Sequence, residues 1–471
     1  MVTMNREEFQ NALRKGLGRA VQHVRNSPPE TVRADLAHAC THFLGMNLQE
    51  ESGGRAEWLF SMIEASGEPD FYRRKVIEAL EQMPDNPDPG DDSETFNELY
   101  RLLTEFAVRG NAESLVVMRR RFDTACVLYQ PYFGFYELFR IEGIDALLRL
   151  MCREWKRIRD DETLWPLDFE IEHAEEELGK EAVQAVLEKE SLVNESVRLC
   201  LERLRRKEAE RLAWEAEREK SKKPLPRLPE LIADLVEDWP RETEWTDDTL
   251  EAAFLQRRSL FRRRHVYAKP TSEELEFAFE QLLETTDPGW QLCLLTAFVK
   301  ETMPRLEPRL LSLCDAPLRP IRSEAVGAFS WITDPRVRAK GLELIAKAPD
   351  FSDWYFGISL LENNYQPEDE SLLLRTLKSV PADIDIHDLH SIVMSLHGLA
   401  EANAGFSFEP ILLWAYENSP CPYCRGKSVE QMIQRNIATK KLLEECRDDS
   451  YERTRKLADT AAESASYGMG G

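Results

Sequence analysis

Two short amphipathic helices, predicted back to back between Pro317 and Ile345, constrain the fold of this chain more than any other feature. In the first helix, apolar and small residues recur at helical spacing along one stripe: Ile321, Ala325, Ala328, Phe329 and Ile332. The second helix repeats the stripe with Val337, Gly341, Leu344 and Ile345. Asp334-Pro335 separates them, because Asp can cap a helix and Pro fits its first position. Neither helix can bury its apolar face alone, so each needs stacked neighbours, as in a solenoid.

Similar segments recur along the second half of the chain. Trp290 to Phe298, Ile321 to Phe329 and Trp354 to Leu361 follow one another at steps of about 31 to 33 residues, within the range of helical repeats. The pattern predicts paired helices that are arranged in repeats.

The spacing Ile321-Arg322-x-x-Ala325-x-x-Ala328-Phe329 resembles the inner-helix pattern of HEAT repeats, in which a β-branched residue and Arg precede small and apolar positions. The segment that begins Val337-Arg338 has Gly341 at the small position, and looser echoes begin at Val32, Val197 and Cys424. The resemblance is clearest over residues 270 to 435. It implies a right-handed superhelix of helices that binds other macromolecules, and it implies no shared catalytic residue.

The length of 471 residues predicts two or more domains, or one long array, rather than a single compact core. We expect an all-α fold, an α-solenoid that joins a helical N-terminal array to a C-terminal HEAT-like array. The predicted parts are an N-terminal array over 1–195, a charged connecting helix and Pro-rich linker over 196–246, a HEAT-like solenoid over 247–449 and a flexible tail over 450–471. The main boundary is placed at Lys223 to Pro229, which reads as an extended linker.

The balance of 85 acidic against 61 basic residues gives a net charge of −24, which repels nucleic acid and anionic membranes overall. The sequence contains no run of 18 apolar residues, so we expect no transmembrane helix. The polar N-terminus argues against a signal peptide. Nine scattered cysteines, mostly within apolar stripes, fit reduced thiols better than a disulfide framework. We therefore expect a cytoplasmic protein with no membrane partner.

Cys421-Pro-Tyr-Cys424 is the sharpest chemical motif, and its letters are those of the dithiol site of glutaredoxins. In that family the pair opens a helix after a strand, within a βαβ domain. Here the preceding segment, Phe408 to Ser419, reads as a helix, and no strand pattern follows. A buried structural thiol pair is the favoured interpretation of Cys421 and Cys424, and a redox-sensitive pair is the alternative.

A zinc site would need further ligands, because a structural site takes four and one Cys-x-x-Cys supplies two. Cys446 and His397 are available but lie at no standard spacing. His387, His390 and His397 flank a buried stripe and are predicted to form the polar edge of a helix. The sequence therefore predicts no metal site and no cofactor.

The strongest charge anomaly lies between Gln256 and Lys269, where six positive charges occur in 14 residues. We call its five guanidinium groups the arginine patch: Arg257, Arg258, Arg262, Arg263 and Arg264. They could bind phosphates or the acidic surface of a partner. Alternatively, they pair with the acids of Glu273 to Glu284 in the same chain. Met118 to Phe122, with three consecutive arginines, is a smaller copy.

The sequence contains no Gly-rich phosphate loop, nucleophile elbow or His-Glu-x-x-His motif, so it predicts no catalytic residue and no small-molecule substrate. The leading hypothesis is a non-enzymatic scaffold that binds an acidic protein through its groove or the arginine patch. The alternatives are a nucleic-acid-binding solenoid that uses the arginine patch and a redox-sensitive protein that uses Cys421 and Cys424.

Overall fold

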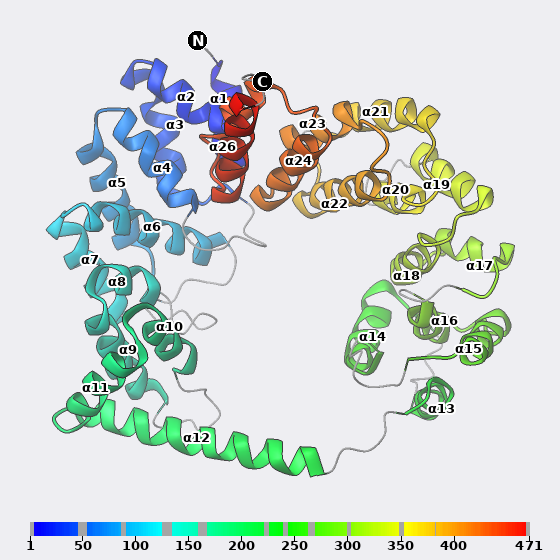
Figure 1. Cartoon of the computed structure of the whole chain (residues 1–471), viewed down its shortest axis with the longest axis horizontal. Coiled ribbons are helices and arrows are strands. Elements are labelled where there is room, and N and C mark those ends of the chain that lie inside the picture. Colours follow the sequence, from blue (N-terminus) through cyan, green and yellow to red (C-terminus); the bar gives the residue numbers. More distant parts are fainter. Residues whose placement is uncertain are drawn as a thin grey trace. The chain divides into compact units, whose positions relative to one another are not determined.

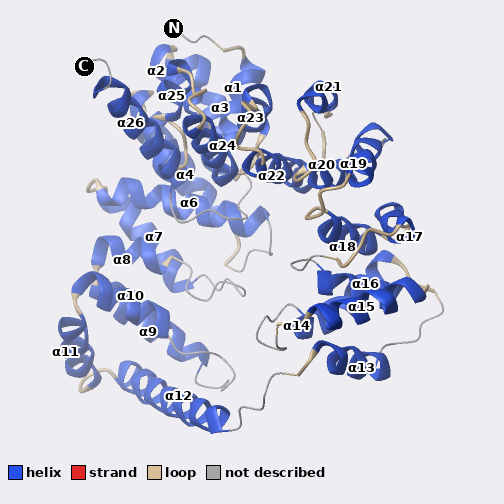
Figure 2. Ribbon diagram, turned by 45° about the vertical axis from the view of Figure 1, so that its right-hand side comes forward, coloured by secondary structure: helices blue, strands red, loops and turns tan. Residues whose placement is uncertain are grey.

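The structure is a computed structural model of the whole chain. It describes residues 4–45, 54–85, 91–124, 134–158, 167–220, 226–238, 244–261, 269–298, 303–347, 353–381 and 383–467. Every regular element in these ranges is a helix (Figure 2). The predicted all-α fold is therefore confirmed. None of the helices described is both long and apolar enough to cross a membrane.

The chain divides into two compact units. Unit 1 contains Met1–Lys222, Cys421–Tyr423 and Thr439–Gly471, and unit 2 contains Lys223–Pro420 and Cys424–Ala438. The first division follows Lys222, next to the Pro-rich segment in which the sequence places its main boundary. The second division falls inside the first turn of one helix.

Unit 1 is built from helices α1 to α12 and from the last two helices of the chain, α25 and α26 (Figure 1). Their bounds are α1 (Arg6–Lys15), α2 (Gly18–Asn26), α3 (Pro29–Thr41), α4 (Gly54–Ala65), α5 (Pro69–Gln82), α6 (Asp91–Val108), α7 (Ala112–Thr124), α8 (Phe135–Glu142), α9 (Ile144–Ile158), α10 (Asp168–Leu178), α11 (Lys180–Ser191), α12 (Glu195–Lys220), α25 (Lys440–Cys446) and α26 (Glu452–Tyr467). Odd-numbered helices α1, α3, α5 and α7 contact one another in series, and α2, α4, α6 and α8 do the same.

Local sequence signals set the ends of these helices. Asn5 and Glu8 form a reciprocal capping box at the start of α1, so two backbone donors of the first turn have partners. Gly16 ends the same helix in the left-handed conformation, with φ of 74°, and donates its backbone N–H to the Ala12 carbonyl. The long helix α12 carries the predicted i,i+4 ion pairs, including Arg198–Glu202 and Arg211–Glu215.

The end of the chain returns to unit 1, where α25 contacts α2. Arg19 and Arg25 pair with Glu445 and Asp448 at 2.8 and 2.9 Å, and the Trp58 indole donates to the Asp448 carbonyl at 2.9 Å. A Cβ added to Gly18 would lie 1.9 Å from the Glu445 carbonyl oxygen, so only glycine permits this approach.

The sequence analysis gives residues 450–471 as a tail, whereas residues 452–467 form α26. The apolar content of this segment is low, and its buried positions include the small residues Thr454 and Ala458. Small side chains give a weak hydrophobic pattern, which explains why the sequence indicates no packed helix here.

Among the described residues, unit 2 contains α13 to α23, the part of α24 from Cys424 onwards, and the 3₁₀ helices η1, η2 and η4. Their bounds are α13 (Leu228–Asp238), α14 (Asp247–Phe261), α15 (Ser272–Glu284), α16 (Pro288–Leu295), η1 (Thr296–Phe298), α17 (Pro308–Leu311), η2 (Ser312–Asp315), α18 (Arg319–Phe329), α19 (Pro335–Lys347), α20 (Trp354–Leu361), η4 (Pro367–Asp369), α21 (Glu370–Lys378), α22 (Ile386–Ala402), α23 (Glu409–Asn418) and α24 (Pro422–Gln434). Helix α13 lies in the stretch 196–246 that the sequence analysis gives to a connecting helix and linker, yet its Leu228 and Ile232 are buried in the core of unit 2.

Alternate helices of unit 2 lie side by side. Contacts join α16 to α18, α18 to α20 and α20 to α22, while α19, α21 and α23 form a second series (Figure 1). The three recurring segments of the sequence are thus α16 with η1, α18 and α20, which are successive helices of one series. Most of the predicted stripe residues of α18 and α19 are buried, and Ile332 is partly buried.

The α18–α19 junction has the predicted form. Asp334 accepts a hydrogen bond from the Arg336 backbone N–H at 2.8 Å, and Pro335 is the first residue of α19. Gly341, which departs from the HEAT-like pattern, lies where α19 crosses α20: its added Cβ would be 2.9 Å from the Gly357 carbonyl oxygen. The glycine pair therefore lets the two helices approach closely.

Candidate functional site

The first turn of α24 positions the two cysteines of the Cys-Pro-Tyr-Cys motif. Pro422 occupies the first helical position, which needs no backbone donor, and so Cys421 stands just before the helix with Cys424 one turn on. The covalent geometry of this turn brings the two side chains to the same side of the helix start. The preceding segment is helix α23, as predicted, so the motif does not follow a strand as it does in glutaredoxins.

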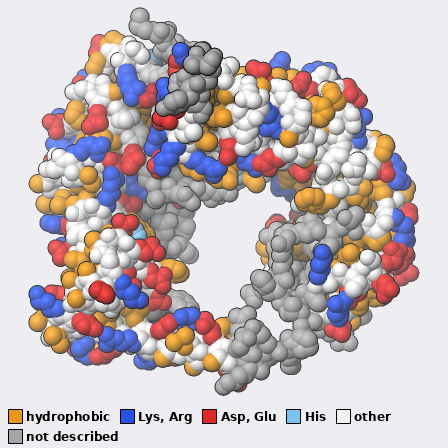
Figure 3. Space-filling model, in the orientation of Figure 1, with side chains coloured by type: hydrophobic (Ala, Val, Ile, Leu, Met, Phe, Trp, Pro, Cys, Tyr) orange, Lys and Arg blue, Asp and Glu red, His pale blue; other side chains and the backbone are white. Residues whose placement is uncertain are grey.

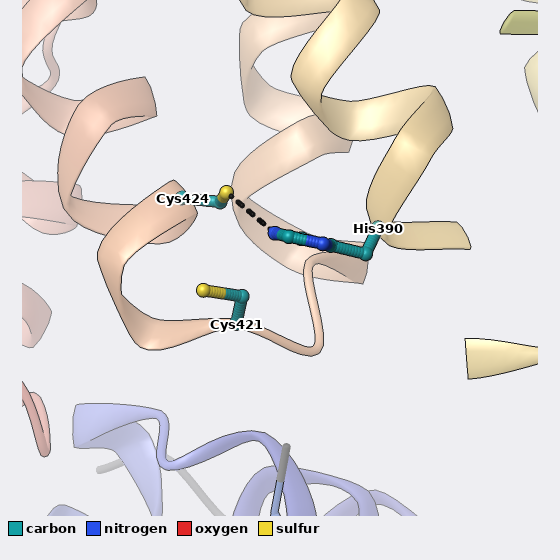
Figure 4. Close-up of side chains that lie close together, drawn as sticks. All are labelled: His390, Cys421 and Cys424. Atoms are coloured by element: carbon teal, nitrogen blue, oxygen red, sulfur yellow. Dashed lines mark hydrogen bonds between the residues drawn. The ribbon is translucent and has the colours of Figure 1, made fainter. Parts of the chain in front are cut away.

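His390 of α22 reaches this turn from the neighbouring helix (Figure 4). Its Nε2 atom lies 3.2 Å from the Cys424 Sγ atom, and the ligand atoms of His390, Cys421 and Cys424 all lie within 4.8 Å of one another. We call these three residues the thiol–histidine cluster. Their exposed fractions are 7% for His390, 1% for Cys421 and 2% for Cys424, so the cluster is closed to bulk solvent.

In the described part of the chain, neither of these cysteines nor any of the other six forms a disulfide bond. Burial of Cys421 and Cys424 fits the favoured interpretation of a buried thiol pair. The structure adds an imidazole beside that pair, which makes a site of two sulfur donors and one nitrogen donor. Such a set suits soft and borderline metal ions, of which zinc is the commonest in proteins.

Cys446 and His397, which the sequence offers as further zinc ligands, do not belong to the cluster. His397 lies two turns beyond His390 on α22, and its Nε2 atom is 2.7 Å from the Ser428 hydroxyl oxygen. Burial first, and then the Lys427 ammonium, lowers the pKa of His397 to about 3, so its imidazole is neutral at physiological pH. The prediction that His390 and His397 form a polar helix edge is wrong, because both are buried, whereas His387 is exposed.

Polar side chains continue from the cluster along the facing sides of α22 and α24. Gln431 donates to the His397 carbonyl at 3.2 Å, and the Lys427 ammonium pairs with Glu401 at 2.8 Å. Ser428 also donates to the Cys424 carbonyl, at 3.2 Å. We call the facing sides of α22 and α24 the polar seam.

Glu362, at the end of α20, lies against α22 next to this seam. A Cβ added to Gly398 would be only 2.6 Å from its carboxylate, so glycine makes room for the acid. Burial, with a smaller effect of the Glu401 charge, raises the pKa of Glu362 to about 7. A carboxyl group whose pKa is raised to about 7 therefore lies beside the polar seam.

The arginine patch falls mostly outside the described residues. Arg257 and Arg258 belong to the backbone of α14, but their side chains, and all of Arg262, Arg263 and Arg264, are not described. The acids that the sequence analysis considers as internal partners are described. Glu274 pairs with Arg227 at 2.6 Å, and both Glu276 and Glu280 pair with Arg305.

The smaller arginine cluster in α7 has partners within unit 1. Arg119 pairs with Glu142, Arg120 with Glu81, and Arg121 with Asp85 at 2.7 Å. Its positive charge is therefore balanced by acids in neighbouring elements, and we assign it no binding role.

The contact between His390 and Cys424 is not predicted from the sequence, although the sequence contains a signal for it. The two residues are 34 apart, close to the steps of about 31 to 33 residues at which similar segments recur in the sequence. A search for histidines one step before the cysteine motif finds His390.

No family model, curated protein or solved structure matches this chain.

Proposed function

We propose that this chain is a non-enzymatic α-solenoid scaffold of HEAT-like repeats, acting in the cytoplasm, that binds another protein with an acidic surface. Hydrogen bonds between neighbouring helices of unit 2 support the repeat arrangement. Asn364 donates to the Ile332 carbonyl 32 residues away, Ser359 bonds Ser395 36 residues on, and His397 bonds Ser428 31 residues on. Similar separations at successive helices are what stacked repeats of one length produce.

The observation that carries the partner assignment is the pairing of the α15 acids. If the arginine patch were neutralised within the chain, the acids from Glu273 to Glu284 would be its nearest partners in sequence. Three of them, Glu274, Glu276 and Glu280, instead pair with Arg227 and Arg305. These three carboxylates already have guanidinium partners, which supports the proposal that the patch binds carboxylates of another protein.

A protein partner fits the charge of the chain better than nucleic acid. The net charge is −24, and on the face drawn in Figure 3 basic and acidic side chains of the described residues are interspersed. A long polyanion would meet repulsion beyond the arginine patch, whereas a compact acidic surface would contact the patch alone.

The proposal is tested by affinity purification of the full-length chain, followed by mass spectrometry of the captured proteins. Three forms are compared: wild type, a variant with all five patch arginines changed to Glu, and a variant with the same five changed to Lys. We expect protein capture by the wild type that survives nuclease treatment and is lost in the Glu variant. The Lys variant keeps the charge but not the bidentate geometry, so it should capture less than the wild type. Circular dichroism of all three forms controls for folding.

Binding to duplex DNA provides the contrary outcome. Five phosphate contacts would make the logarithm of the binding constant fall with the logarithm of salt concentration at a slope of about −4 to −5. DNA binding at physiological salt with this slope, lost in the Glu variant, would replace the scaffold proposal by nucleic-acid binding.

A further inference from the structure

We propose that the thiol–histidine cluster binds one zinc ion through Cys421, Cys424 and His390, with a buried water molecule in its fourth coordination position. The proposal goes beyond the scaffold function and does not depend on the arginine patch.

The geometry is close to that of a bound ion. Zn–S distances of about 2.3 Å and Zn–N distances of about 2.0 Å place sulfur and nitrogen ligands about 3.6 Å apart around a tetrahedral zinc. The Cys424 Sγ and His390 Nε2 atoms are 3.2 Å apart, and the whole set lies within 4.8 Å. A shift of a few tenths of an ångström would bring the Cys424 and His390 atoms to this separation, and shifts of at most about 1 Å would bring the other pairs to three corners of a tetrahedron.

The local sequence holds two of the ligands in place. Two cysteines separated by two residues are a common zinc ligand pair, and here the pair spans the first turn of α24. The third ligand comes from a different helix, α22, so an ion at this point would cross-link the two sides of the polar seam (Figure 4). Hydrogen bonds of Ser428 to the Cys424 carbonyl and to the His397 ring also help to fix α24 against α22 beside the cluster.

Charge selects a divalent ion. Two thiolates and a neutral imidazole carry a charge of −2, which Zn²⁺ cancels and Cu⁺ leaves at −1. The three side chains are at least nine-tenths buried, and an uncancelled buried charge is costly. Zinc, as a borderline-soft divalent ion, accepts both sulfur and nitrogen donors.

Zinc binding should release protons, and its affinity should therefore depend on pH. Zn²⁺ forms two Zn–S bonds and one bond to the His390 ring nitrogen, and the two thiol protons are released to solvent. No electron is transferred. Apparent affinity therefore falls as pH falls, by up to about 100-fold per pH unit while both thiols are protonated in the free protein.

The test uses the full-length chain, reduced with a phosphine, stripped with a chelator and titrated with Zn²⁺ against a chromophoric competitor. We expect one zinc per chain and release of two protons per ion. Cys421→Ser, Cys424→Ser and His390→Asn should each weaken binding by more than about 100-fold, since even residues that only support ligands contribute 10- to 100-fold. His387→Asn and Cys314→Ser are matched controls: His387 is an exposed histidine of the same helix, and Cys314 is a buried thiol outside the cluster. Both should bind zinc as the wild type does.

Binding of Co²⁺ to the wild type, followed by absorption spectroscopy, tests the ligands directly even if a variant fails to fold. A thiolate-to-cobalt charge-transfer band in the near ultraviolet, with intense tetrahedral visible bands, is the expected spectrum. Failure of the reduced wild type to bind zinc, binding that Cys421→Ser and Cys424→Ser leave unchanged, or a cobalt spectrum without the thiolate band would overturn the proposal. The proposal would also be overturned if Cys421 and Cys424 formed a disulfide and the pair still failed to bind zinc after reduction.

Discussion

Unit 2 holds its helices together in two different ways. The series α16, α18 and α20, which we call the apolar row, shares one hydrophobic cluster that includes Leu292, Phe329 and Leu360. The polar seam between α22 and α24 is instead made by His390, His397 and the residues opposite them. Stability of the apolar row depends on filled volume, whereas stability of the polar seam depends on partners and protonation. Two parts of one helical unit therefore depend on different kinds of interaction.

The largest expected effect is loss of a buried ring from the apolar row. Phe329→Ala removes a fully buried side chain from α18 and should destabilise unit 2 by about 3–5 kcal/mol, because a cavity remains. Urea unfolding followed by circular dichroism measures the change. Trp331→Ala, two residues on and 59% exposed, is the control and should change stability by less than about 1 kcal/mol. Equal losses at the two positions would contradict a volume-dependent row.

The packing of Glu362 beside the polar seam should instead make stability depend on pH. The pKa of Glu362 is raised from 4.5 to about 7, so the unfolded chain releases this proton first and stability falls as pH rises between those values. Glu362→Gln removes the ionisation, and its stability relative to wild type should increase from pH 5 to pH 8, by up to about 3 kcal/mol. Thermal unfolding across this range measures the difference. Glu409→Gln, an exposed change on α23, should follow the wild type; a constant difference for Glu362→Gln would contradict the assignment.

The close approach of α19 to α20, next to the apolar row, can be tested at a single glycine. A Cβ at Gly357 would lie 2.7 Å from Ile345 Cγ1 and 2.8 Å from the Gly341 carbonyl oxygen. Gly357→Ala should therefore cost about 1–3 kcal/mol through overpacking of α19 against α20. Gly405→Ala is the control, since nothing lies within 4 Å of its added Cβ. A stabilised Gly357→Ala protein would show that α19 and α20 do not approach this closely.

The smallest expected effect is loss of one hydrogen bond from the polar seam. Ser428→Ala leaves the buried His397 ring without its hydroxyl partner and should cost about 1 kcal/mol, rising to about 3 if no water replaces it. Ser371→Ala, at an exposed hydroxyl of α21, is the control. If both variants unfold at the same urea concentration as the wild type, the His397–Ser428 bond contributes no stability.

The apolar row could be predicted from the sequence, and the polar seam only in part. Helical periodicity marks Ile321, Ala325 and Phe329, because burial of a continuous stripe leaves a repeating pattern in the chain. The cluster depends on a contact between residues 34 apart, and periodicity within one helix carries no such information. His390 is polar, so the pattern assigns it to a helix edge, although a thiol partner makes its burial favourable. For the same reason a segment of small residues such as α26 gives little sign of its packed side.

Hydrogen exchange of the full-length reduced chain, measured by mass spectrometry with and without Zn²⁺, tests the central contrast most directly. Zinc at 100 times its dissociation constant adds about 2.7 kcal/mol to the state that binds it. Our account predicts slower exchange in peptides from α22 and α24, a smaller change in α18 and α20, and no such difference in Cys424→Ser. Unchanged exchange in α22 and α24, or equal protection of every helix in unit 2, would contradict it.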